Sequence, residues 1–188
     1  MSKIIPIVKS PNKILRRIAK EASLEEISSP QIQKLIAGMK VTLKNTPDGV
    51  GLAAPQVGKS LRIFIVSEEA EAIDSAQKKG WRRRNIDKPE EVHEKPYKEK
   101  EWKYYVFINP TVSNLSKNKV EGAEGCLSVP GKYGEVKRQE KITVVAWDEK
   151  GRRFTRGASR FFARVLQHEM DHLNGILFID KAEKVREL

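Results

Sequence analysis

The sequence Gln167-His168-Glu169-Met170-Asp171-His172 contains two histidines four positions apart, and it constrains the structure of this chain more than any other segment. Residues four apart lie on the same face of an α-helix, so both imidazoles can bind one metal ion. Glu169 lies about 100° further around the helix, where its carboxylate can reach a water on that ion without being a ligand. The alternative is a surface helix that carries two incidental histidines.

The residues around this motif extend the predicted helix from Ser159 to Gly175. Apolar side chains recur in it at helical spacing, which indicates a buried face. A second helix is predicted to begin at Ser29-Pro30, with serine as the N-cap and proline at the first position. Its apolar residues are Ile32, Leu35, Ile36 and Met39, and the sequence from Asn45 to Gly49 ends it.

Short strands are predicted at residues 61–66, 105–109, 120–127 and 142–147. Asp148-Glu149-Lys150-Gly151 is typical of a hairpin turn, and it leads into a further strand at residues 153–155. Strands and helices are segregated and do not alternate strictly, which favours the α+β class over a doubly wound sheet. The chain contains no internal repeat.

The length and composition are those of one folded domain. The 188 residues include 36 Lys and Arg against 25 Asp and Glu, a net charge of +11 that suits an anionic partner. No spacing marks a recognition helix or a stacking platform for nucleic acid. A single cysteine excludes an internal disulfide, no apolar run approaches the roughly 20 residues of a membrane helix, and no export signal is present. We therefore expect a cytoplasmic protein.

The densest charge lies between Glu68 and Lys103, where ten acidic and ten basic side chains nearly cancel. This segment has no sustained apolar period. We interpret it as a solvated or hairpin-like excursion between two strands, with no catalytic role. His93, inside it, is expected to be a bystander.

Cys126 is the candidate for a third metal ligand. Catalytic metal sites usually have three protein ligands plus a water, and no histidine follows His172. A thiolate suits a divalent transition metal. The cysteine lies in Glu124-Gly125-Cys126-Leu127-Ser128-Val129-Pro130, where the preceding glycine and the later proline fix a local bend. The alternative is a small residue that fills the core.

A third segment, Gly49-Val50-Gly51-Leu52-Ala53-Ala54-Pro55-Gln56-Val57-Gly58, carries closely spaced glycines that let a ligand approach the backbone. It is not a phosphate-binding loop, because the Gly-x4-Gly-Lys-Ser/Thr pattern is absent. Gln56 offers an amide donor among apolar neighbours. The alternative is a turn residue whose hydrogen bonds are satisfied locally.

These three segments, in this order, resemble the motifs of the peptide deformylase family. The resemblance covers most of the chain and implies antiparallel β-sheets packed around a central metal-binding helix. Together with the length of the chain, it predicts a single catalytic domain over residues 1–188, which a charged insert at about 68–103 interrupts. The implied activity is that of a metal-dependent hydrolase, which removes the N-formyl group from the N-terminal formylmethionine of newly synthesised polypeptides and releases formate.

The resemblance assigns roles to individual residues. It makes Cys126, His168 and His172 the metal ligands, and Glu169 the group that takes a proton from water and returns it to the leaving amine. The Gln56 amide and the Leu127 backbone N–H would donate to the formyl oxygen. Residues expected to bind substrate, the last two lining the pocket for the methionine side chain, are Val50, Gly51, Glu124, Gly125, Phe161 and Val165.

The resemblance also implies a cofactor and partners. The cofactor is one divalent metal ion, Fe²⁺, which Zn²⁺, Ni²⁺ or Co²⁺ can replace. The partners are N-formylmethionyl nascent peptides and, transiently, the ribosome, with no specific DNA and no membrane. Family members that end in a long basic helix dock on the ribosome with it, and this chain ends at Leu188, so docking by that route is not expected.

The sequence departs from the family pattern at the long insert, at Tyr133, where some members have a substrate-proximal arginine, and at Arg164, where some have an apolar residue near the methionine pocket. Three alternatives stay open. A zincin-type metallopeptidase would need a ligand downstream of His172. A basic nucleic-acid-binding module would need a closed site with four ligands. An inactive deformylase-like protein would have to keep every motif residue without turnover.

Overall fold

The computed structural model describes residues 3–78 and 103–187. The α-helices are α1 (Leu24–Ile27), α2 (Pro30–Lys44), α3 (Glu69–Lys78) and α4 (Arg160–Leu173). The 3-10 helices are η1 (Lys13–Arg16), η2 (Ala54–Val57) and η3 (Phe178–Asp180). The strands are β1 (Gly51–Ala53), β2 (Ile63–Ser67), β3 (Tyr104–Leu115), β4 (Lys119–Cys126), β5 (Val129–Gln139), β6 (Lys141–Trp147), β7 (Arg153–Ser159) and β8 (Val185–Glu187).

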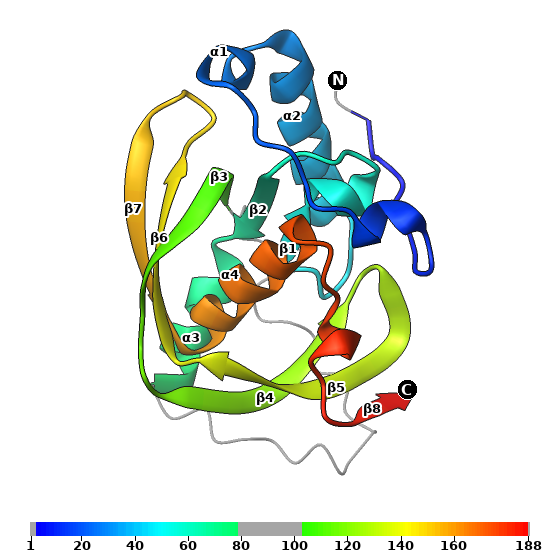
Figure 1. Cartoon of the computed structure of the whole chain (residues 1–188), viewed down its shortest axis with the longest axis vertical. Helices are drawn as coiled ribbons and strands as arrows, with labels where there is room; N and C mark the ends of the chain where they lie inside the picture. The colour runs from blue at the N-terminus through cyan, green and yellow to red at the C-terminus, as the bar shows by residue number, and fades with distance from the viewer. Residues whose placement is uncertain (1–2, 79–102, 188) are drawn as a thin grey trace.

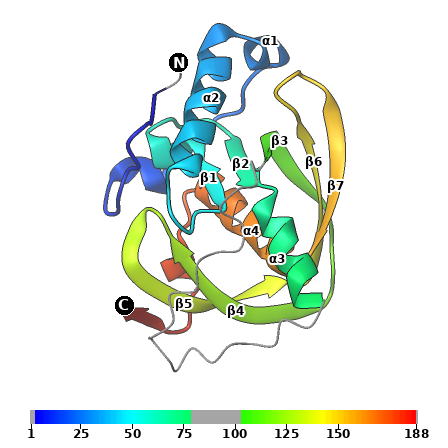
Figure 2. The same cartoon turned by 180° about the vertical axis from the view of Figure 1, so that it is seen from behind.

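Two antiparallel sheets surround one helix. The larger has the strand order β1-β2-β3-β6-β7 and the smaller β4-β5-β8. Helix α4, drawn in orange, lies in the middle of the molecule in both views and packs against β1, β2 and β7 of one sheet and β5 of the other (Figures 1 and 2). The predicted α+β fold with a central helix is therefore confirmed.

Helix α2 forms where its sequence predicts it. The Ser29 hydroxyl accepts the N–H of Ile32 at 3.3 Å, and Pro30 occupies the first turn, where no N–H is needed. Its apolar face joins a core cluster with strands β1, β2 and β3, in which Met39 is fully buried. The helix ends at Asn45, as expected.

The segment between β2 and β3 begins differently from the prediction. Residues 69–78 form helix α3, which packs against α4, so the interpretation as a solvated or hairpin-like excursion is wrong for this part. Glu and Ala favour a helix without an apolar stripe. Tertiary contacts then fix α3, because Ala70 is fully buried and Glu71 accepts a hydrogen bond from Tyr105 and pairs with Arg156. Residues 79–102, with His93, lie outside the described residues.

Strand β5 was not predicted, because its sequence, Val-Pro-Gly-Lys-Tyr-Gly-Glu-Val-Lys-Arg-Gln, contains few apolar residues. It pairs with β4 in register from Lys119–Gln139 to Gly125–Tyr133, and an irregularity follows before Cys126 pairs with Val129. The turn at Leu127 and Ser128 therefore presents Cys126 at the end of a hairpin.

Candidate metal centre

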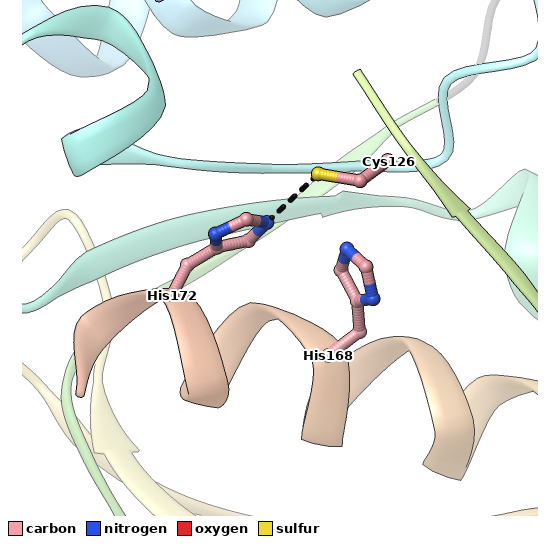
Figure 3. A group of neighbouring side chains, drawn as sticks. All are labelled: Cys126, His168 and His172. Atoms are coloured by element: carbon pink, nitrogen blue, oxygen red, sulfur yellow. Dashed lines mark hydrogen bonds between the residues drawn. The ribbon is translucent and has the colours of Figure 1, made fainter. Parts of the chain in front are cut away.

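Three potential metal ligands converge in the interior. Cys126 ends β4, whereas His168 and His172 project from one face of α4 toward it (Figure 3). Cys126 Sγ lies 3.2 Å from His172 Nε2, and one ligand atom from each of the three residues lies within 4.8 Å of the others. The helical spacing and the hairpin end thus bring together the three residues that the sequence singled out.

The donor set fits a divalent transition metal. In a tetrahedral site with typical bond lengths, a sulfur and a nitrogen ligand lie about 3.6 Å apart, close to the separation between Cys126 and His172. Burial lowers the pKa of His172 well below its usual value, so its ring is neutral, as a ligand must be. One thiolate and two imidazoles suit Zn²⁺ or Fe²⁺ better than Mg²⁺ or Ca²⁺.

Glu169 lies next to the ligands without belonging to them. Its side chain is buried, and within the described residues its Oε2 has no hydrogen-bond partner. Burial raises the pKa of this carboxyl to about 7, so it can both take and give a proton near neutral pH. The carboxyl packs directly against the main chain of Gly51: a Cβ at position 51 would lie only 2.4 Å from Glu169 Oε1.

Gln56 points its amide toward the cysteine. Its Oε1 accepts the N–H of Ala53 at 2.8 Å, and this bond leaves Nε2 directed at Ser128 Oγ, 3.2 Å away, and at Cys126 Sγ, 3.6 Å away. The N–H of Ser128 also donates to the sulfur at 3.4 Å. An N–H donor beside the ligands is placed to interact with a developing negative charge.

The carboxylate of Glu124 contacts the ring of His168 on the side of Nδ1. Nδ1 of His168 lies 3.0 Å from Oε2 of Glu124, so the ring donates there and leaves Nε2 for a metal. Burial alone would raise the pKa of Glu124, but hydrogen bonds from Arg138 and His168 hold it at about 2. Glu124, expected among the substrate-binding residues, thus uses its oxygens inside the protein.

A cavity of about 500 Å³ opens beside this group of residues. It is lined by every residue that the sequence assigned to the site except His172, which lies deeper: Val50, Gly51, Gln56, Glu124, Gly125, Cys126, Leu127, Phe161, Val165, His168 and Glu169. Lys9 and Arg164 also line it. A ligand in this cavity can therefore meet the catalytic candidates and two loops at once: the Gln56 loop, residues 54–58, which includes η2, and the Cys126 loop, the hairpin end at residues 126–129.

The N-terminal segment ties these two loops together. The N–H of Val8 donates to the carbonyl of Gln56 at 2.7 Å, and the N–H of Ser10 donates to that of Ser128 at 2.8 Å. Between them, the Lys9 ammonium donates to the Leu127 carbonyl at 2.5 Å. Residues 8–10 thus fix the relative position of the Gln56 and Cys126 loops.

The sequence did not predict the ion pairs that Glu124 and Asp171 form beside the metal ligands. Arg138 donates to both oxygens of Glu124 and to Asp171, which also accepts from Lys181. One pattern points to Arg138: it lies two positions after the buried Val136, on the same inward face of β5. Ser128 and Asp171 had no comparable indication beyond their place in a motif, and Lys9, far from every motif in the sequence, had none.

A cysteine sulfur, two imidazoles on one helix and an adjacent buried glutamate, beside one cavity, are the residues that define the class of single-metal hydrolases with a His-Glu-x-x-His helix. The chain belongs to the polypeptide deformylase family, whose model matches residues 4–187. The family resemblance stated from the three motifs is thereby confirmed.

Relatives with known names agree with this assignment. A peptide deformylase of Thermus thermophilus is 39% identical over 182 residues, which cover 96% of this chain and 83% of the relative. A chloroplastic/mitochondrial peptide deformylase 1A of Arabidopsis thaliana is 38% identical over 93% of this chain, which spans only 60% of that relative's length. A peptide deformylase of Symbiobacterium thermophilum is 38% identical over 97% of this chain and 69% of its own.

Solved structures give the same result. The Met-Ala-Ser-bound class I type b peptide deformylase of Acinetobacter baumannii superposes with a TM-score of 0.74 at 35% identity, covering 96% of this chain and 99% of the other. A peptide deformylase of Synechococcus elongatus in complex with actinonin gives 0.72 at 30% identity, over 98% and 84%.

Proposed function

We propose that this chain hydrolyses the formyl amide of N-terminal formylmethionine in newly made polypeptides, releasing formate and a free amine. The observation that carries the proposal is the buried carboxylate of Glu169 beside the group of Cys126, His168 and His172, with Glu169, Cys126 and His168 lining one cavity. A substrate bound in that cavity would have its scissile amide next to a proton-transfer group and a metal ligand set.

Cys126, His168 and His172 would hold one divalent ion, for which we propose Fe²⁺, with Zn²⁺, Ni²⁺ or Co²⁺ as substitutes. When bound, such an ion supplies Lewis acidity and lowers the pKa of water from 15.7 toward about 7. The chain contributes the orientation of the ligands. Glu124 fixes the tautomer of His168, and the hairpin end at Leu127 fixes the sulfur of Cys126.

Glu169 would transfer the protons. Its pKa of about 7 lets the carboxylate take a proton from the attacking water and return it to the leaving nitrogen. The Gln56 amide and the Leu127 N–H would donate to the formyl oxygen as negative charge grows on it. Removing one such donor typically costs about 3–4 kcal/mol of transition-state stabilisation.

The cavity walls would select the substrate. Val50, Gly51 and Gly125 line the cavity and would contact the substrate backbone, whereas Phe161 and Val165 from α4 would provide an apolar wall for the methionine side chain. We keep residues 1–188 as one catalytic domain. We also propose that the charged segment at about 68–103 has no catalytic role.

The proposed partners are formylated nascent peptides and, transiently, the ribosome, without specific DNA binding, and the proposed location is the cytoplasm. The described helices are all too short or too polar to cross a membrane. The relative from Arabidopsis is named as chloroplastic/mitochondrial.

The test compares formyl-Met-Ala-Ser with acetyl-Met-Ala-Ser and unformylated Met-Ala-Ser, with and without a chelator. We expect formate from the formyl peptide alone, loss of activity with chelator, and recovery with Fe²⁺. Metal analysis of protein purified without oxygen identifies the resident ion. Cleavage of the Met-Ala bond in the unformylated peptide would instead indicate a metallopeptidase, and the proposal would then be wrong.

A further inference from the structure

Arg164 is a buried cation in α4 that the proposed reaction does not use. It lies one helical turn before His168, and only 9% of its surface is exposed. An unpaired charge at such a depth would be strongly destabilising. Its partners therefore show what the residue does.

The guanidinium joins α4 to the hairpin that carries Cys126. Nη1 donates to Glu124 Oε1 at 2.9 Å and to the Val136 carbonyl at 2.7 Å, and Nη2 donates to the Val120 carbonyl at 2.8 Å. Nη1 also lies 3.0 Å from the Gly122 carbonyl. Arg164 thus contacts both strands of the hairpin and the carboxylate that orients His168.

Gly122 makes room for this side chain. A Cβ at position 122 would lie 2.9 Å from Arg164 Nη2 and 3.0 Å from Cζ, so β4 approaches the guanidinium as closely as a residue without a side chain allows. The position of Arg164 is therefore defined from three sides: by Glu124, by the hairpin carbonyls and by Gly122.

The metal ligands come from the same two elements that Arg164 connects. Cys126 belongs to β4 and His168 to α4, so the distance between sulfur and imidazole depends on how these elements are held together. Arg138 binds Glu124 from the other side, with Nη2 to Oε2 at 2.7 Å and Nε to Oε1 at 2.8 Å. With two guanidinium groups on it, the carboxylate has a fixed position from which to accept the His168 N–H.

We infer that Arg164 is a positioning residue for the metal centre: by clamping Glu124 and the β4–β5 hairpin onto α4, it aims His168 Nε2 at Cys126. This inference rests on the proposed function only in taking the three ligands to bind a metal. It concerns metal affinity, and it can fail while the deformylase activity of the wild-type chain stands.

The experiment measures the dissociation constant of Zn²⁺ for the metal-free protein, by competition with a chelating dye, and the absorption spectrum of the Co²⁺ form. Arg164→Met keeps an unbranched apolar stem, though a shorter one, and removes the guanidinium donors. We expect Zn²⁺ to bind about 10–100-fold more weakly, the usual effect of removing a partner of a metal ligand. The Co²⁺ spectrum should change, and Arg164→Lys should recover part of both.

Two further variants separate positioning from general stability. Arg156→Met removes another partly buried arginine, which pairs with Glu71 and covers the Tyr105 ring, away from the ligands. It should lower the melting temperature but leave Zn²⁺ affinity unchanged. Gly122→Ala keeps every charge and pushes on the guanidinium, so it should weaken Zn²⁺ binding in the same direction as Arg164→Met, and it serves if that variant does not fold.

A double-mutant cycle tests the route through Glu124. If Arg164 acts through this carboxylate, its effect should be small once the carboxylate is gone. Arg164→Met should therefore change the Zn²⁺ dissociation constant much less in the Glu124→Gln background than in the wild-type background. Fully additive effects, or wild-type Zn²⁺ affinity in both Arg164→Met and Gly122→Ala, would overturn the inference. Absence of formate release by the metal-loaded wild-type chain would instead overturn the proposed function.

Discussion

Helices α2 and α4 have nearly the same length, 15 and 14 residues, yet they bury different chemistry. The buried residues of α2 are apolar or glycine, except Thr42, which bonds the main chain of Ile5. Helix α4 buries four ionisable side chains among its apolar residues: Arg164, Glu169, Asp171 and His172.

The difference shows that the two helices have different roles: α2 contributes to stability, and α4 carries the residues of the candidate site. Burial of α2 removes apolar surface from water and needs no specific partner. A buried ionisable group needs a partner, and the β4–β5 hairpin supplies two of them: Glu124 pairs with Arg164, and Arg138 pairs with Asp171. Glu169 alone among these carboxylates keeps an oxygen without a partner in the described part of the chain. We therefore expect substitutions in α2 to change the stability of the protein, and substitutions of the buried ionisable residues in α4 to change catalytic activity or metal binding.

The largest effect is expected from Glu169→Ala. Turnover of a formyl-Met peptide should fall by about 10²–10⁴-fold or more, because the positioned proton-transfer group is lost, while the metal content stays the same. Turnover should fall by a similar factor in Glu169→Gln, which keeps the shape of the side chain but cannot take up the proton. Near-normal formate release from either metal-loaded variant would contradict the role of Glu169.

Met39→Ala tests the other helix. Met39 is fully buried in α2, so its truncation should lower the free energy of unfolding by about 2–5 kcal/mol, measured by urea denaturation. The turnover number of the folded fraction should not change. Met170→Ala in α4, where the side chain is only partly buried, is the matched control and should destabilise less. Equal losses at both positions would remove the contrast between the helices.

Gly51→Ala is expected to act on α4 from outside it. The new methyl group would collide with the Glu169 carboxylate, and a displacement of about 1 Å at a catalytic group can cost 10²-fold in rate. We expect the turnover number to fall by about that factor with little change in melting temperature. Gly157→Ala in β7, where a Cβ meets nothing within 4 Å, is the control. Equal activity of the two variants would show that Gly51 does not hold Glu169.

The smallest effect concerns the helix N-termini. Ser29 caps α2 with its hydroxyl, whereas Ser159, the N-cap of α4, makes no side-chain capping bond. Ser29→Ala should therefore lower the free energy of unfolding by about 1 kcal/mol, and Ser159→Ala by less. Thermal or urea unfolding of both variants measures the difference. A larger loss for Ser159→Ala would mean that α4 depends on its cap more than its geometry indicates.

The same contrast explains what the sequence could predict. Helix α2 was predicted from Ser29 to Asn45 because its cap, proline and apolar spacing are local features. The strands predicted at 120–127 and 142–147 correspond to β4 and β6. Strand β5 was missed because hydrogen bonding to β4 and β8, and not its own apolar pattern, keeps it extended.

The candidate site divides in the same way. The ligand residues were identified because a spacing of four on a helix and a lone cysteine are visible in the sequence. The pairing of Arg138 and Arg164 with Glu124 was not, since it joins residues 14 and 40 positions from that carboxylate. Helix α3 was misread because its stability comes from Glu71 and its contacts with Tyr105 and Arg156.

The three hydrogen bonds from residues 8–10 to the two loops have a consequence for biosynthesis. A ribosome makes the chain from its N-terminal side, so residues 8–10 emerge well before α4 is complete. The carbonyls of Gln56 and Ser128 and the imidazole of His172 must all be available before the site can take its final form. The proposed activity on unfinished polypeptides would therefore require that nearly all of the described part of this chain has itself been translated first.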